Sequence, residues 1–173
     1  MSPADAAYPM GEPVDQARFR AALGRFPTGV AVITCLVDGA DHAMTANSLT
    51  SVSLDPPLVL VCVERETRFH EAILAASQWG VSVLGAGARG AASWLATRGR
   101  PLAGQLDPVA HHRSSLTGVA LLDDALAWLE VRTTAVYDGG DHSIVVGEVV
   151  SLSLAAEPGA ALTYFRGQYG RLS

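Results

Sequence analysis

The sequence is poor in the residues that mark several common classes of protein. Only 17% of its 173 residues are charged, only 6% are aromatic, and acidic residues outnumber basic ones by 17 to 12. The resulting net charge of −5 argues against nucleic acid as a main partner, because domains that bind nucleic acid are usually basic. No apolar run reaches the about 18 residues of a membrane-spanning helix, so no membrane association is expected.

Cysteine is also scarce, and the beginning of the chain lacks a secretion signal. Residues 1–13 have no basic block followed by an apolar stretch, so we expect a disordered lead-in to one domain over residues 14–173. The two cysteines, Cys35 and Cys62, stand in apolar strand-like runs, which favours reduced core thiols over a disulfide or a nucleophile. Together these features predict a cytoplasmic protein.

Familiar catalytic and metal-binding motifs are missing. The chain has no G-x-S-x-G elbow and no H-E-x-x-H, so nothing specific indicates a hydrolase. The pair His111-His112 has no third ligand at a useful spacing, and neighbouring side chains point in different directions. We therefore expect no metal site and place this pair in a polar, irregular segment over residues 105–116.

One glycine motif resembles a nucleotide-binding fingerprint. Gly85, Gly87 and Gly90 match G-x-G-x-x-G between a strand-like and a helix-like segment. A dinucleotide site also needs a returning parallel strand with an acidic residue near its end, and residues 102–111 show no strand pattern. The motif is better explained as a turn of small residues, although a Rossmann-type dehydrogenase remains the third alternative for function.

What is abundant is apolar sequence in short runs. Helix spacing or capping residues predict helices over residues 14–26, 67–77 and 88–97. Apolar and β-branched runs predict strands over 29–37, 42–46, 58–63, 79–84, 125–137 and 143–154, with an aromatic, glycine-punctuated tail over 161–172. The strands follow one another through hairpins such as Asp38-Gly39, so the fold class is mainly β, an antiparallel barrel with a few peripheral helices. An apolar content of 49% in so small a domain favours an oligomer interface.

The most informative segment spans residues 43–57. Six hydroxyl or amide side chains follow one another without a charge: Thr45, Asn47, Ser48, Thr50, Ser51 and Ser53. A solvated loop would carry Lys, Glu or Gly here. Neutral donors beside a core suit an anionic or heteroaromatic ligand, because hydroxyl and backbone N–H groups bind phosphate without any lysine.

Three blocks in order along the chain resemble one known family. The first is Phe-Pro-Thr-Gly-Val over 26–30, continued by 44–48 and 51–62; the second is Gly-Asp-His-Ser-Ile over 140–144 with 147–149; the third is Tyr-Phe-Arg-Gly-Gln-Tyr over 164–169. They are similar to the short-chain flavin reductases, the reductase components of two-component flavin monooxygenases. The likeness covers nearly the whole domain.

This resemblance implies an FMN-binding split β-barrel and a homodimer with flavin sites near the subunit interface. It implies that FMN or FAD is reduced by NADH or NADPH and passed to a separate monooxygenase. His142 is implied as the catalytic residue, beside the nicotinamide cofactor. The implied cofactor-binding residues are Thr28, Thr45, Ala46, Asn47, Ser48, Ser51, Val52, Ser53, Cys62, His142 and Tyr169.

The chain departs from the family pattern at one place. Such reductases often carry a basic residue followed by Phe where this chain has residues 101–104, Pro-Leu-Ala-Gly. Arg89, Arg98 or Arg100 could supply the positive charge instead, and the sequence does not choose among them. The second alternative for function is a flavin-binding split-barrel protein that acts as a carrier or sensor without turnover.

Overall fold

The computed structural model describes residues 13–157 and 159–173. The expected disordered lead-in over 1–13 lies outside the described residues except for Pro13. The described helices are α1 (Gln16–Leu23), α2 (Arg68–Ala75), the 3₁₀ turn η2 (Ala86–Ala88) and α3 (Arg89–Ala96). The strands are β1 (Thr28–Gly29), β2 (Ala31–Val37), β3 (Ala40–Ala46), β4 (Thr50–Leu54), β5 (Pro57–Glu64), β6 (Gln78–Leu84), β7 (His111–Arg113), β8 (Ala120–Leu122), β9 (Ala125–Gly139), β10 (His142–Leu154), β11 (Ala161–Phe165) and β12 (Gln168–Leu172).

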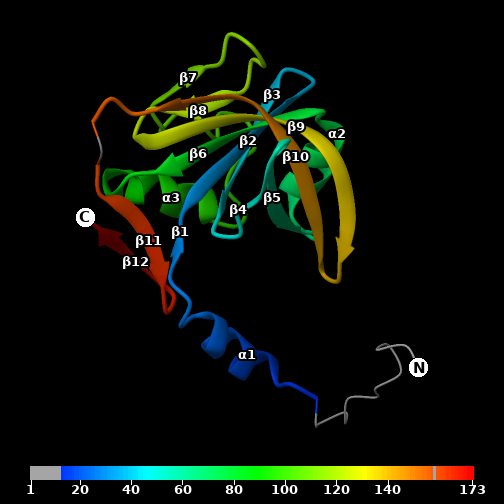
Figure 1. Ribbon diagram of the computed structural model, residues 1–173, viewed down its shortest axis with the longest axis vertical. Coiled ribbons are helices and arrows are strands. Elements are labelled where there is room, and N and C mark those ends of the chain that lie inside the picture. The colour runs from blue at the N-terminus through cyan, green and yellow to red at the C-terminus, as the bar shows by residue number, and fades with distance from the viewer. Residues whose placement is uncertain (1–12, 158) are drawn as a thin grey trace.

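Seven strands form one curved antiparallel sheet in the order β3-β2-β6-β9-β10-β5-β4 (Figure 1). A three-stranded sheet, β1-β11-β12, and the β7–β8 hairpin complete the fold. This arrangement confirms the mainly β, antiparallel class with peripheral helices. No helix in the described part of the chain has the length and apolarity needed to cross a bilayer.

The strand β2 is buried on both faces, which explains its unbroken apolar sequence. Ile33 and Cys35 face a core that contains Trp79 and Val131, both fully buried, and that α2 covers. Val30 and Val32 face a second core, closed by α3, β8 and β11. A strand between two cores has no polar face, so β-branched residues follow one another without alternation.

The expected elements are largely present. The strands and helices predicted from periodicity all occur, with ends shifted by a few residues, and α1 ends at Leu23 rather than at Phe26. The Asp38-Gly39 hairpin is confirmed: both residues have a left-handed φ, 51° and 77°, as the tight turn between β2 and β3 requires.

Several local expectations were wrong. The segment 105–116 is not irregular throughout, because His111–Arg113 pairs with Ala120–Leu122. Thr67 stands at the N-cap of α2, but its hydroxyl donates to the Glu64 carbonyl and accepts no hydrogen bond from the N–H groups of the helix. The hydroxyl-rich segment also contains the strand β4, which was not predicted because polar and apolar residues alternate over only four positions, 51–54.

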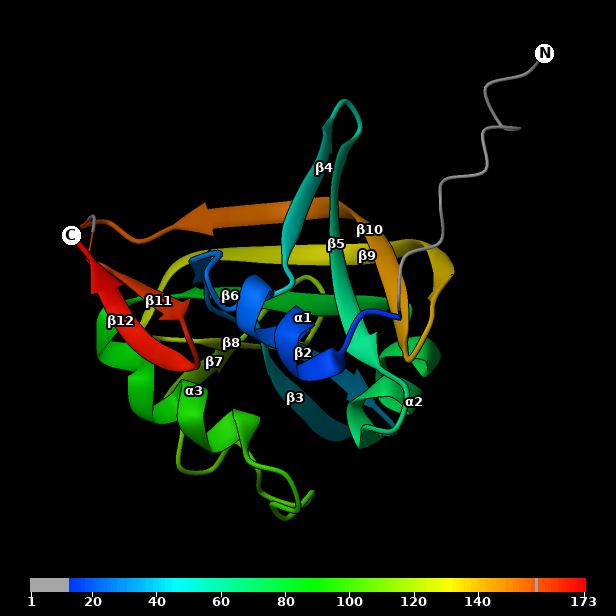
Figure 2. The same ribbon diagram turned by 90° about the horizontal axis from the view of Figure 1, so that it is seen from below.

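Some large apolar side chains are exposed on the surface. Figure 1 shows α1 extending away from the body of the molecule, and Figure 2 shows the β4–β5 hairpin projecting from the sheet. None of the residues of α1 is buried, and Phe19, Leu23 and Phe26 are more than half exposed. On β5 only alternate residues are buried, so the apolar run over 58–63 is buried on one face only.

Candidate functional site

A small cavity lies between β3, α3 and the C-terminal hairpin. It has a volume of about 190 Å³ and is lined by Val30, Thr45, Ala46, Asn47, Ala96, Tyr164 and Tyr169. The rings of Tyr164 and Tyr169 meet edge to face, with centroids 5.5 Å apart. Thr28 pairs with Tyr164 across β1 and β11, and its hydroxyl is buried with no hydrogen-bond partner among the described residues. The fold thus gathers predicted site residues from the first and third blocks.

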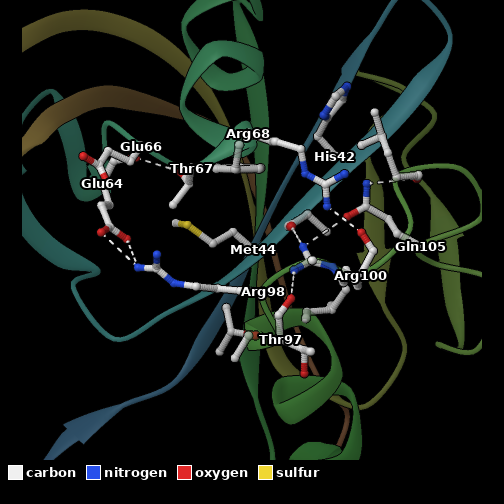
Figure 3. A pocket seen from close by; sticks show the side chains of 17 residues that line it. His42, Met44, Glu64, Glu66, Thr67, Arg68, Thr97, Arg98, Arg100 and Gln105 are labelled. Carbon is white, nitrogen blue, oxygen red and sulfur yellow. Dashed lines mark hydrogen bonds and ion pairs between the residues drawn. The ribbon is translucent and has the colours of Figure 1, made fainter.

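A larger cavity of about 490 Å³ adjoins the small one at Thr45 and Ala96, which line both. It opens between the start of α2, the end of α3 and β3, and its charged lining residues are Glu64, Glu66, Arg68, Arg98 and Arg100. Figure 3 shows Arg98 pointing toward Glu64 at one side of this cavity. Arg68 and Arg100 lie at the other side, near His42 and Gln105, with Met44 between the two sides.

The hydroxyl-rich segment divides into residues that hold the fold together and residues that do not. The Thr45 hydroxyl donates to the Ala92 carbonyl at 2.8 Å and thereby ties β3 to α3. Ser48 Oγ is 3.1 Å from both the backbone N–H and the carbonyl of Cys62, and Ser53 Oγ accepts from the Asp55 N–H. For Asn47 and Ser51 no side-chain hydrogen bond occurs within residues 13–157 and 159–173, so the described fold does not use these two side chains as donors.

Ser51, Val52 and Ser53 line neither cavity. They lie on β4, at the edge of the large sheet, where Ser51 and Val52 are exposed. Their predicted role in cofactor binding stays a prediction, as do those of the residues at the cavities.

His142 lines neither cavity, but it lies next to Glu64, which lines the larger one. It begins β10 and pairs with Glu64 of β5, and paired residues of antiparallel strands present their side chains on the same face. Its Nδ1 lies 2.7 Å from Asp141 Oδ1, and this hydrogen bond and the nearby imidazole lower the pKa of the Asp141 carboxyl. Arg65 Nε donates to the His142 carbonyl at 3.3 Å, which helps to fix the turn.

The titratable groups near the site are poor candidates for acid–base or nucleophilic chemistry. Burial, and secondarily Asp41, raises the pKa of Cys35 to about 12, and burial raises the pKa of Cys62. Both are free thiols that stay protonated at neutral pH; Cys35 is buried, as predicted, whereas Cys62 is only half-buried. Burial also raises the pKa of Tyr169, so its hydroxyl remains a hydrogen-bond donor.

The structure narrows the choice of arginines that could supply positive charge at the site. Arg98 and Arg100 line the larger cavity, whereas Arg89 lines neither cavity. Arg68, which sequence reasoning missed, joins them from the first turn of α2. No spacing in the sequence indicates this cluster, because α2 and the loop after α3 meet only when the sheet curls.

The glycine motif has no dinucleotide-binding context. β6 leads into η2 and α3, but both neighbours of β6 in the sheet are antiparallel to it. The βαβ unit that a Rossmann fingerprint needs is therefore missing around Gly85, Gly87 and Gly90.

Comparison with known proteins gives a consistent result. The sequence profile of the flavin reductase like domain matches residues 23–173. The chain is 43% identical over 142 residues to the "NADH-dependent FAD reductase" of Streptomyces globisporus, covering 81% of this chain and 77% of that protein. It is 38% identical over 155 residues to the "FMN reductase (NADH) SmoA" of Agrobacterium fabrum, covering 90% and 85%. The crystal structure of BorF, the flavin reductase component of a bacterial two-component tryptophan halogenase, superposes with a TM-score of 0.85 at 43% identity, covering 91% and 98%.

The curled antiparallel sheet is thus a split barrel of the flavin reductase type. The chain belongs to the flavin reductase-like family, as the three sequence blocks indicated.

The donor set at the two cavities fits a flavin. The small cavity offers aromatic rings and the neutral Asn47 amide, which suit a heteroaromatic ring system. The larger cavity offers arginines, and Arg100 Nε is a buried donor that has no acceptor among the described residues. An anionic or carbonyl-bearing chain beside Arg100 would supply an acceptor.

Proposed function

We propose that this protein is a flavin reductase that uses NADH or NADPH to reduce FMN or FAD. The observation that carries the proposal is the meeting of Thr45, Ala46 and Asn47 with Tyr169 at one cavity, beside a second cavity lined by arginines. Family membership supports the same activity, because the relatives named above are reductases of FAD or FMN.

The reaction requires little of the protein beyond holding the flavin and the nicotinamide cofactor in the right orientation. When both cofactors are bound, the nicotinamide supplies a hydride that the flavin accepts, so no protein nucleophile is needed. Tyr164 and Tyr169 would border the flavin ring, and the Asn47 amide would donate to its polar edge. His142, which neighbours Glu64 of the larger cavity, would orient the nicotinamide cofactor. Neutral hydrogen-bond donors and protonated thiols are compatible with hydride transfer, because this reaction does not require a cysteine thiolate.

We further propose that the protein works as a homodimer. Phe19 and Leu23 on α1, and Phe26 just after it, are more than half exposed, and Leu152 and Leu154 on β10 are 63% and 72% exposed. Large apolar side chains exposed in this way often mark an interface. Light scattering at micromolar concentration should give twice the chain mass; a monomer mass would contradict the proposal.

The reduced flavin would serve a separate monooxygenase in the cytoplasm. One relative, in Rhodococcus opacus, is named as the reductase component of a nitrophenol monooxygenase, which supports such a partner. The two free thiols, Cys35 and Cys62, support a reducing compartment.

The direct test follows the absorbance of NADH and of NADPH with FMN or FAD added. We expect turnover well above the enzyme-free blank for at least one pair. A protein that binds flavin tightly but never exceeds the blank would instead be a carrier or sensor, and the reductase proposal would fall.

A further inference from the structure

The turn that carries His142 is tight and exposed. β9 and β10 pair as far as Gly139 and His142, so the turn itself consists of Gly140 and Asp141. Gly140 has a φ of 77°, which suits the first position of a two-residue hairpin turn, and the Asp141 side chain is 89% exposed. The turn buries none of its own residues, so contacts from other segments decide where it lies.

Arg65, the residue after β5, holds this turn at three points. Its backbone N–H donates to the Asp141 carbonyl at 3.0 Å, one residue beyond the last β5–β10 pair, Glu64 with His142. Its Nε donates to the His142 carbonyl at 3.3 Å, and its Nη2 donates to Asp138 Oδ1. The planar guanidinium group therefore bridges the two strands on either side of the turn.

A second contact holds β10 just after the turn. Ser143 is only 3% exposed, and its Oγ lies 2.9 Å from Nε2 of His70, in α2. His142 thus stands between two residues, Asp141 and Ser143, that are both attached to the segment over 65–70. This segment fixes the backbone on both sides of His142.

The same segment forms one wall of the larger cavity. Glu64, Glu66, Thr67 and Arg68 line that cavity, whereas Arg65 does not and is instead bound to the turn. Figure 3 shows Glu64, Glu66 and Thr67 together at one side of the cavity. A displacement of this segment would therefore move the cavity wall and the His142 turn together.

We propose that Arg65 is a positioning residue, which fixes His142 at the place from which the imidazole orients the nicotinamide cofactor. The inference rests on the proposed flavin reductase function and adds a residue that acts through His142. Stability does not explain the Arg65 contacts, because the Arg65 and Asp138 side chains are 44% and 81% exposed and exposed ion pairs contribute little to folding. Their effect is geometric, and a misplacement of about 1 Å at a reacting site lowers rates by up to about 100-fold.

Amide hydrogen exchange of the protein without any cofactor tests the structural part of the proposal. Arg65→Ala should speed exchange in peptides that cover residues 138–144, because local opening of the turn becomes easier. The matched control is Arg132→Gln: Arg132 also joins β9 to β10, through Glu148 at 2.6 Å, but it lies away from the turn and lines neither cavity. It should change neither exchange at the turn nor flavin reduction. Unchanged exchange in Arg65→Ala would overturn the proposal.

Stopped-flow reduction of pre-bound flavin by NADH or NADPH tests the functional part. Arg65→Ala should lower the reduction rate by about ten-fold and leave flavin affinity and the midpoint of thermal unfolding nearly unchanged. In the His142→Ala background the same substitution should lower the rate by less than about two-fold, because the side chain that Arg65 positions is gone. Arg65→Lys should not restore the rate, since a flexible ammonium group does not reproduce the Nε and Nη2 contacts. Asp138→Ala, which keeps the arginine and removes one acceptor, should lower the rate by a smaller factor.

These variants separate positioning from direct binding of a cofactor. A ten-fold loss that persists in the His142→Ala background, or full activity in Arg65→Lys, would mean that Arg65 acts by its charge and would overturn the proposal. A wild-type rate in Arg65→Ala would overturn it too, as would a wild-type rate in His142→Ala, which leaves Arg65 no residue to act through. In each of these cases, reduction of flavin by the wild-type protein would leave the proposed function intact. A wild-type protein that reduces no flavin would instead count against the function itself.

Discussion

The packed interior of the large sheet differs from the cleft beside β3, which comprises the two cavities, in how completely its space and its polar groups are filled. In the interior, Trp79, Val81, Val131 and Val145 are fully buried, and Gly147 leaves just enough room for Trp79. In the cleft, polar side chains keep unused donors and two cavities remain open. In the interior, the choice of residue is limited by the volume that its side chain must fill. In the cleft, polar groups are left without hydrogen-bond partners. Substitutions in the interior should therefore change stability, and substitutions in the cleft should change binding.

The largest effect is expected in the interior, from Gly147→Ala. A Cβ there would lie 2.4 Å from Val131 Cγ1 and 2.8 Å from the Arg132 carbonyl, which is backbone and cannot move aside cheaply. We expect the free energy of unfolding to fall by about 3 kcal/mol, at the upper end for overpacked cores. Urea unfolding followed by circular dichroism measures it.

The matched control is the same substitution at Gly90, in α3, where a Cβ would meet nothing within 4 Å. Gly90→Ala should leave stability unchanged or raise it by up to about 1 kcal/mol, because alanine is the better helix former. It should not alter the use of NADH, since the glycine motif has no βαβ context. Equal destabilisation by both substitutions would contradict the contrast.

The next largest effect is expected beside the cleft, from His142→Ala. If His142 orients the nicotinamide cofactor, the rate of flavin reduction should fall by about 10–100-fold, because small misplacements of reacting atoms raise the barrier steeply. Flavin affinity should stay nearly unchanged. Stopped-flow reduction of pre-bound flavin measures the rate directly. A wild-type rate would make His142 an ordinary turn residue, held by Asp141.

Within the hydroxyl-rich segment, the structure separates binding from stability. Asn47→Ala and Ser51→Ala each remove an unused neutral donor, so flavin affinity should fall by roughly three- to twelve-fold, for about 0.5–1.5 kcal/mol per hydrogen bond. Ser48→Ala should instead lower stability, because Ser48 Oγ bridges to the backbone of Cys62. Flavin titration and thermal unfolding of all three variants test this. Loss of affinity in the Ser48 variant alone would reverse the assignment.

The smallest effect concerns an acid in the sheet, Glu130. Burial by itself would raise its pKa, but hydroxyl donors from Ser114, Thr117 and Ser151 together lower it below the usual 4.5. A folded pKa below the unfolded one means that the carboxylate stabilises the fold above pH 4.5, and this stability is lost as the pH falls through the folded pKa. Unfolding measured from neutral to acid pH should show this loss in the wild type and not in Glu130→Gln. Parallel curves for the two proteins would contradict it.

The sequence by itself determined the main helices, the longer strands and the family. Local patterns are enough for this: β-branched runs, the Asp38-Gly39 turn and the three motif blocks each depend only on residues close along the chain. The same patterns identified Thr45, Ala46, Asn47 and Tyr169, and the structure gathers all four at one cavity. The strands β4, β7 and β8 were not predicted because they are short: β7 and β8 have three residues each, and β4 alternates polar and apolar residues over only four.

Only the tertiary structure decided which of these side chains are available. Whether a hydroxyl is free depends on its partner: Thr45 and Ser48 are bound to Ala92 and Cys62, 47 and 14 residues away along the chain, whereas Asn47 is not bound in this way. The arginine-lined cavity likewise has no local signature. Arg68 and Arg98 come from separate segments, and they face a common space because the curled sheet brings α2 and α3 to the same strand, β3.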